Sequence, residues 1–137
     1  MRKGYVESNL WDYPANVAEL EELRYEYDSL KSVECQKYEA HTPNGASDPV
    51  SEVVHRRLKL ERRMRGLERR IRPVKRLRDD LKQGSEARIS QMRAVLKLRY
   101  LEHKSHDDVI RQMSVSKATY TRRLRELLRL ARKYFGE

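Results

Sequence analysis

Hydrophobic residues recur at helical spacing in two runs near the C-terminal end of the chain. Val109, Ile110 and Met113 form a stripe of only two turns, which a serine-rich segment interrupts. The longer run then places apolar residues three and four positions apart: Tyr120, Leu124, Leu127, Leu128, Ala131 and Tyr134. Ser105 and Ser116 stand in front of the two runs, where a hydroxyl group caps the free N–H groups of a helix start. The pattern predicts a short helix, a tight turn and a longer helix.

The segment upstream supplies a third helix. Its apolar positions are Ile89, Met92, Val95, Leu96, Leu98 and Leu101. Ser85 is expected to cap this helix, and Asp108 occupies the acid position of a capping box that begins at Ser105. The three stripes predict a three-helix domain over residues 85–137. A short helix, a turn and a longer basic helix follow one another in DNA-binding helix-turn-helix motifs, whose second helix lies in the major groove.

On this geometry the first turns of the longer helix would read the edges of the bases. Arginine and lysine donate to guanine acceptors, and the methyl group of a threonine contacts thymine. The residues expected at bases are Lys117, Ala118, Thr121 and Arg122, with Ala118 allowing close approach. The residues expected at phosphates are Ser105, Arg111, Ser116, Thr119, Arg123 and Arg125. The alternative interpretation is an amphipathic helical hairpin whose arginines only face solvent.

A long helix is predicted in the middle of the chain, over residues 51–83. Its apolar seam alternates steps of four and three residues, as in a coiled coil: Leu60, Met64, Leu67, Ile71 and Val74. Pro73 should kink this helix, because it lacks the N–H group that would bond to the carbonyl of Arg69. The seam needs a partner, which is the N-terminal helix of the same chain, the same helix of a second subunit, or both in one dimer. We therefore assign these five residues, together with Trp11, to oligomerisation.

The N-terminal part of the chain predicts two helices and a loop. A short helix should stop at Pro14, because the residue before a proline is pushed out of the helical region. A second helix is expected from about Ala15 to about Tyr38, and turn-forming residues predict a loop over residues 40–50, with Pro49 at the first helical position. The chain is therefore expected to be all-α. Residues 1–83 form a helical arm for oligomerisation, and residues 85–137 form the helix-turn-helix domain.

The charge of the chain is unevenly distributed. Residues 1–50 hold 5 Lys and Arg against 10 Asp and Glu, whereas residues 51–137 hold 26 against 11. The basic part suits a polyanion such as double-stranded DNA. The sequence has no apolar run long enough to span a bilayer and no signal-peptide pattern, and its single cysteine, Cys35, fits a reducing compartment. We therefore expect a cytoplasmic protein with no membrane partner.

Enzymatic chemistry is not expected from this sequence. No glycine-rich phosphate loop precedes a Lys-Ser or Lys-Thr pair, and the adjacent acids Asp79-Asp80 and Glu21-Glu22 point in different directions on a helix. The possible zinc ligands lack the paired close spacings of structural sites: Cys35, His41, His103 and His106. We predict no catalytic residues, no cofactor and no metal.

The C-terminal segment from Arg99 to Tyr120 resembles region four of bacterial sigma factors, which reads promoter DNA. Over nearly its whole length the chain resembles the phage late-gene transcription activators of the RinA/ArpU type. The features that carry this resemblance are Leu10-Trp11-Asp12-Tyr13-Pro14 before an acidic leucine-rich helix, Ser47-Asp48-Pro49 after a loop, a long basic helix and the sigma-like end. The chain departs from the pattern at His103-Lys104-Ser105-His106, which replaces the usual glycine-containing turn.

The resemblance implies a sequence-specific DNA-binding activator of phage packaging and structural genes. Such a protein would work at the nucleoid of a bacterial host cell, as a dimer or tetramer, and would contact RNA polymerase. A phage terminase small subunit that binds packaging-site DNA is an alternative, because it also combines a helix-turn-helix with helical oligomerisation elements. A second alternative is a helical adaptor that binds a partner protein through its long helix.

Overall fold

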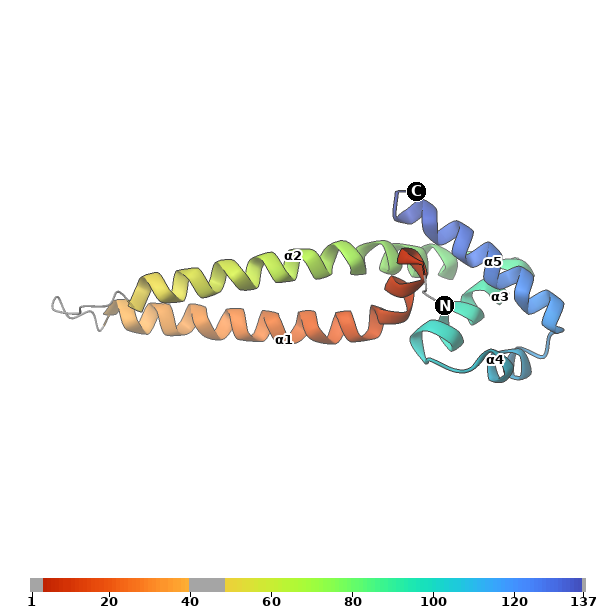
Figure 1. Cartoon of the computed structure of the whole chain (residues 1–137), viewed down its shortest axis with the longest axis horizontal. Coiled ribbons are helices and arrows are strands. Elements are labelled where there is room, and N and C mark those ends of the chain that lie inside the picture. Colours follow the sequence, from red (N-terminus) through yellow and green to blue (C-terminus); the bar gives the residue numbers. More distant parts are fainter. Residues whose placement is uncertain (1–3, 40–48, 137) are drawn as a thin grey trace. The chain divides into compact units, whose positions relative to one another are not determined.

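The computed structural model describes the backbone of residues 4–39 and 49–136, and the side chains of residues 4–30 and 51–136. Over these residues the fold is all-α, as predicted, and contains no strand. Figure 1 shows the elements in chain order: α1 (Tyr5–Glu39), α2 (Pro49–Lys82), α3 (Ala87–Val95), the π-helical segment η1 (Leu96–Leu101), α4 (His106–Met113) and α5 (Lys117–Tyr134). Pro49 is the first residue of α2, as predicted. None of these helices is long and apolar enough to cross a membrane.

The chain divides into two compact units. The hairpin unit comprises residues 17–69, and the C-terminal unit comprises residues 70–136 together with residues 4–16. This division differs from the boundary predicted between residues 83 and 85, because both α1 and α2 contribute to both units. The first turns of α1 belong to the C-terminal unit through side-chain contacts, such as that of Glu7 with Tyr100.

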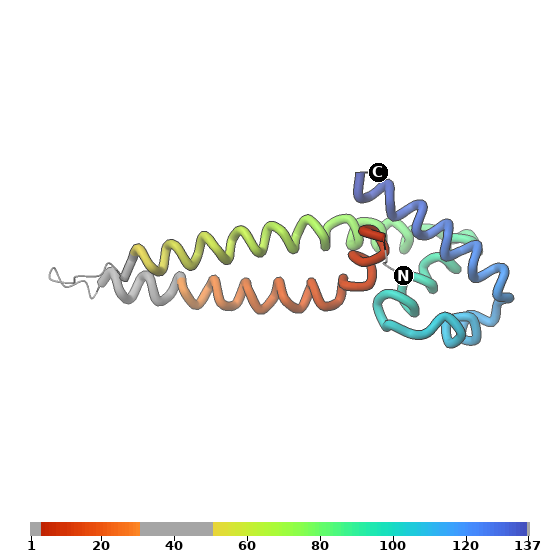
Figure 2. The backbone as a smooth tube through the Cα atoms, in the orientation of Figure 1, coloured from red at the N-terminus to blue at the C-terminus, as the bar shows by residue number. Residues whose placement is uncertain are grey.

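In the hairpin unit, α1 and α2 run side by side in opposite directions (Figure 2). Leu20 of α1 is buried with Val53, Leu60 and Leu67 of α2, while Met64 is half-buried. Polar contacts flank this apolar seam: Arg63 pairs with Glu19, Arg24 with Glu68 at 3.3 Å and Arg56 with Glu26 at 2.9 Å, and Tyr27 donates to Glu61 at 2.8 Å. Of the two partners that the sequence allows for the seam, the N-terminal helix of the same chain covers it here.

The C-terminal unit has a core to which every one of its elements contributes. Its buried residues are Val6, Leu10 and Tyr13 of α1; Ile71, Val74, Leu77 and Leu81 of α2; Met92, Val95, Leu96 and Tyr100 of α3 and η1; and Val109, Tyr120, Leu127 and Ala131 of α4 and α5. Arg93 of α3 donates to the carbonyl oxygens of Leu81 and Lys82, both at 3.2 Å, and so satisfies acceptors at the end of α2. Burial of Ile71 and Val74 within the chain leaves them little apolar surface for a second subunit.

Two local predictions are wrong. Pro14 does not end a helix, because α1 continues through it; burying Leu10 and Tyr13, at about 2 kcal/mol each, offsets the roughly 3 kcal/mol that an internal proline costs. The N-cap of α3 is Glu86 and not Ser85, and its side chain makes no capping hydrogen bond. The predicted third helix is present as α3 and continues in π geometry from Leu96 to Leu101. The predicted loop, including His41, lies largely outside the described residues.

Candidate nucleic-acid interface

The two C-terminal helices are separated by residues 114–116 and capped as predicted. The Ser105 hydroxyl accepts a hydrogen bond from the Asp108 N–H at 3.2 Å, and the Ser116 hydroxyl accepts one from the Thr119 N–H at 3.1 Å. Between them Ser114 adopts the left-handed conformation, with φ 55° and ψ 43°, and its N–H lies 3.3 Å from the carbonyl oxygen of Arg111. A left-handed residue at this place stops the first helix and turns the chain toward the second.

One face of α5 packs into the core of the C-terminal unit. Leu127 and Ala131 are fully buried, and α5 packs against α3. The Tyr120 hydroxyl is hydrogen-bonded to Nδ1 of His106 in the first turn of α4. Burial raises the pKa of the Tyr120 phenol, and the nearby Arg99 acts in the opposite direction. These contacts fix α5 from its first turn onward, so its other face is held in a defined position.

The outward face of α5 carries an open basic hollow. Its lining residues are Lys117, Ala118, Thr121, Arg122, Arg125, Glu126 and Arg129. The four residues predicted to contact bases, Lys117, Ala118, Thr121 and Arg122, therefore lie together on one surface. The Thr121 hydroxyl donates to the carbonyl oxygen of Lys117 at 2.9 Å. Arg129 was not among the predicted site residues, although its spacing of four from Arg125 could have placed it on this face.

The residues predicted to contact phosphates do not share one environment. Arg125 lines the hollow, and the Arg111 side chain is 78% exposed, with Nη1 lying 3.6 Å from an Asp108 carboxylate oxygen. Ser105, Ser116 and Thr119 are occupied at the helix starts, and the Ser116 hydroxyl also donates to the Thr119 hydroxyl at 2.9 Å. Their side chains therefore have a structural role, whereas the two arginines are exposed to solvent.

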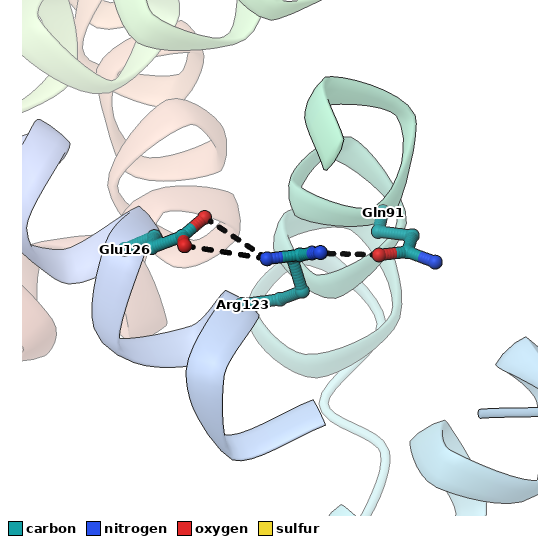
Figure 3. Close-up of polar contacts among 3 residues, drawn as sticks. All are labelled: Gln91, Arg123 and Glu126. Carbon is teal, nitrogen blue, oxygen red and sulfur yellow. Dashed lines mark hydrogen bonds and ion pairs between the residues drawn. The ribbon is translucent and has the colours of Figure 1, made fainter. Parts of the chain in front are cut away.

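Arg123 is the member of the phosphate set that the structure places differently (Figure 3). Its Nε donates to Oε1 of Gln91 on α3 at 2.6 Å, and its Nη1 lies 3.2 and 3.3 Å from the two carboxylate oxygens of Glu126. The side chain is only 16% exposed, and that of Glu126 is 27% exposed. The prediction that Arg123 contacts phosphate is not supported by this position, because the guanidinium group is turned to α3 and already paired.

The corner between η1 and α4 contains a residue with a positive φ that is not glycine. His103 adopts a left-handed φ of 56°, a conformation that usually favours glycine. Its ring stacks on that of Trp11, with centroids 3.8 Å apart and planes 9° apart, and Nε2 lies 2.7 Å from the carbonyl oxygen of Trp11. The Arg99 guanidinium also lies 4.8 Å from the centroid of the Trp11 ring. Trp11, predicted to act in oligomerisation, thus contacts two residues of the C-terminal unit, His103 and Arg99.

Two tyrosine hydroxyls join distant parts of the C-terminal unit. The fully buried Tyr100 donates to a Glu7 carboxylate oxygen at 3.0 Å, and burial, followed by the negative charge of Glu7, raises its pKa strongly. The Tyr134 hydroxyl donates to Asp80, and burial together with this carboxylate raises the pKa of Tyr134 to about 12. Both phenols therefore stay protonated and act as donors at neutral pH.

Two of the three histidines considered as zinc ligands make other contacts. His103 contacts Trp11, and His106 contacts Tyr120. The side chains of Cys35 and His41 are outside the described residues. Within the part of the chain that the structure describes, no three His, Cys, Asp or Glu side chains gather as a metal site would require.

Comparison with known proteins places the chain in a family without assigning it a function. No curated protein and no solved structure matches the chain. One family model matches residues 44–132, which cover α2 and nearly all of the C-terminal elements described above. The chain therefore belongs to the family described as protein of unknown function (DUF1492).

Proposed function

We propose that this protein is a sequence-specific, double-stranded DNA-binding regulator of transcription, in which the first half of α5 enters the major groove. The observation that carries this proposal is the exposed basic hollow on α5, directly after a short capped helix and a three-residue turn. In DNA-binding proteins with this order of elements, the N-terminal residues of the second helix contact base edges and the first helix crosses the backbone.

The chemistry of the hollow supports recognition of bases. Lys117 and Arg122 present donors that match the O6 and N7 acceptors of guanine, and Ala118 between them has no side chain long enough to hold a base pair away. Arg125, Arg129 and the exposed Arg111 would neutralise phosphates and orient the helices. Arg123, by contrast, supports the site from behind by joining α5 to α3.

The biological role that we propose follows from the resemblance to phage late-gene activators. In that role the protein acts in the cytoplasm of a bacterial host, switches on packaging and structural genes, contacts RNA polymerase and catalyses no reaction. A homo-oligomer would bind a repeated or palindromic site. Because the seam of α2 is largely covered within the chain, oligomerisation through Leu60 or Leu67 would require the hairpin to open.

The proposal is tested by footprinting on the genome segment that flanks the gene, followed by competition between the protected duplex and a random duplex at moderate ionic strength. We expect Arg122→Ala to reduce discrimination by about 1–3 kcal/mol and Arg129→Ala to leave it unchanged. Equal competition by random and native duplexes would show that α5 does not read sequence. Assembly into a ring of many subunits on packaging-site DNA would indicate a terminase small subunit instead.

A further inference from the structure

A row of arginines follows the outer face of α2 in the hairpin unit. Arg62, Arg65 and Arg69 are spaced by three and four residues, so they lie on one side of the helix. All three are exposed, whereas Leu60 and Leu67, on the opposite side, are buried against α1. We call these three residues the arginine ridge. The spacing continues along the sequence of α2 at Arg72 and Arg76, which belong to the C-terminal unit.

The ridge carries positive charge that the hairpin does not neutralise. Four acidic side chains of the hairpin form contacts between α1 and α2. Glu19 pairs with Arg63, Glu26 with Arg56 and Glu68 with Arg24, and Glu61 accepts a hydrogen bond from Tyr27. Among the described residues, no acidic side chain pairs with any arginine of the ridge. Arg65 contacts its own helix, where its Nε lies 3.5 Å from the carbonyl oxygen of Glu61.

We propose that the arginine ridge is a second nucleic-acid-binding surface, which binds the sugar-phosphate backbone of double-stranded DNA independently of α5. From Arg62 to Arg69 the helix rises by about 10 Å. One DNA strand presents a phosphate about every 3.4 Å along the helix axis, so this length spans roughly three phosphates. Guanidinium groups are always charged and bind phosphate with two parallel hydrogen bonds.

The composition of the ridge favours a backbone ligand over an acidic protein. Its three members are all arginines, without an apolar or aromatic side chain between them on the same face that could pack against a partner helix or stack on a base. The exposed apolar residues of this face, Val54 and Leu58, precede the ridge. A protein partner would need these two side chains, whereas the DNA backbone would not. The ridge is therefore expected to add affinity without adding sequence preference.

The test uses the full chain and a random-sequence duplex, because sequence reading by α5 then plays no part. Affinity is measured by fluorescence anisotropy at salt concentrations from 50 to 200 mM for the parent and for R62Q/R65Q/R69Q. Three lost phosphate contacts should lower the slope of log affinity against log salt by up to about 2.7. Over this range the parent should then lose about 40-fold more affinity than the variant. The preference of the variant for a footprinted duplex over random duplex should equal that of the parent.

A charge-matched control separates a local surface from total charge. R24Q/R56Q/R63Q removes the same three charges from arginines that are paired with acids, and these pairs are exposed enough for the helices to form without them. Circular dichroism checks the helicity of both variants. We expect the control to keep the parent's salt slope. An equal change of slope in both variants, or no change in the ridge variant, would overturn the proposal.

Two further variants distinguish this proposal from others. V54S/L58S should bind the random duplex as the parent does. Binding to polyglutamate is measured for the same proteins. If V54S/L58S and the ridge variant both bind polyglutamate more weakly than the parent but bind the duplex equally well, this face binds an acidic protein instead of DNA. Arg122→Ala reports on the function proposed for α5 and should change sequence preference but lower the salt slope by no more than about one. If the parent prefers no duplex over another, the function proposed for α5 is refuted. The difference in salt slope between the parent and R62Q/R65Q/R69Q still tests the arginine ridge.

Discussion

Two adjacent arginines of α5 should have opposite roles, and exchanging each for an uncharged residue tests this directly. Arg122 is exposed at the basic hollow, whereas Arg123 is turned inward to Gln91 and Glu126. We expect Arg123→Met to destabilise the fold and to leave the salt dependence of DNA binding unchanged. We expect Arg122→Ala to weaken specific DNA binding and to leave the fold intact.

The structure sets the size of the expected loss of stability. Hydrogen bonds to charged groups contribute about 1.5–3 kcal/mol when they are shielded, and fully exposed ion pairs contribute about 0.2–1 kcal/mol. Arg123 and Glu126 are 16% and 27% exposed, so their contact lies between these cases. Removing Arg123 also leaves the Gln91 amide oxygen without its donor. We estimate a loss of about 2 kcal/mol for Arg123→Met, against less than about 0.5 kcal/mol for Arg122→Ala.

Thermal and urea denaturation followed by circular dichroism measure this difference. For a domain of the size of the C-terminal unit, a loss of 2 kcal/mol corresponds to a decrease in Tm of roughly 8–16 °C. R123M/E126Q leaves no unpaired carboxylate and should recover part of the loss, with a coupling of about 1 kcal/mol in the double-mutant cycle. If Arg123→Met kept its Tm and lowered the salt slope by about one, Arg123 would be a phosphate contact and the reasoning would be refuted.

Two further predictions concern stability. A Cβ atom at Gly84 would overlap the Ile89 side chain, so Gly84→Ala should lower the free energy of unfolding by about 1–3 kcal/mol in urea denaturation. Gly66→Ala places its Cβ with no atom within 4 Å and should stabilise the protein by about 0.4–1 kcal/mol. Equal effects of the two substitutions would contradict the contact with Ile89. The raised pKa of Tyr100 predicts stability that is fully present below pH 10 and decreases above it, by up to about 1.4 kcal/mol per pH unit. Tyr100→Phe should lack this part of the decrease, and parallel stability curves for parent and variant would show that the Tyr100 proton does not matter.

Features set by neighbouring residues could be predicted from the sequence, and those set by distant residues could not. The caps at Ser105 and Ser116 depend on an N–H group three positions away, so the local pattern was sufficient. The face of α5 that carries Lys117 and Arg122 likewise follows from helical spacing. The role of Arg123 could not be predicted, because its partner on α3 is 32 residues away and periodicity does not identify it.

The same distinction explains the other differences. An apolar seam on α2 shows that the helix has a partner but not which one, so the sequence allowed either α1 or a second subunit. Pro14 was expected to end a helix on local grounds, and tertiary burial of Leu10 and Tyr13 outweighs that preference. The left-handed His103 was not foreseeable either, since its stacking partner Trp11 is 92 residues away.

The C-terminal unit is built from two segments that are far apart in the sequence, residues 4–16 and 70–136, and this affects folding during synthesis. During translation, the hairpin unit can form as soon as residue 69 has left the ribosome, because all its interhelical pairs are then present. Residues 4–16 cannot pack until their partners in residues 70–136 have been synthesised. The hydrogen bond between Glu7 and Tyr100, for example, can form only after the hairpin has been synthesised. Val6 and Leu10 are buried in the folded protein and therefore remain exposed on the nascent chain until the rest of the C-terminal unit has been synthesised. For the same reason, a fragment beginning at residue 85 would lack part of its own core and would be a poor choice for expression.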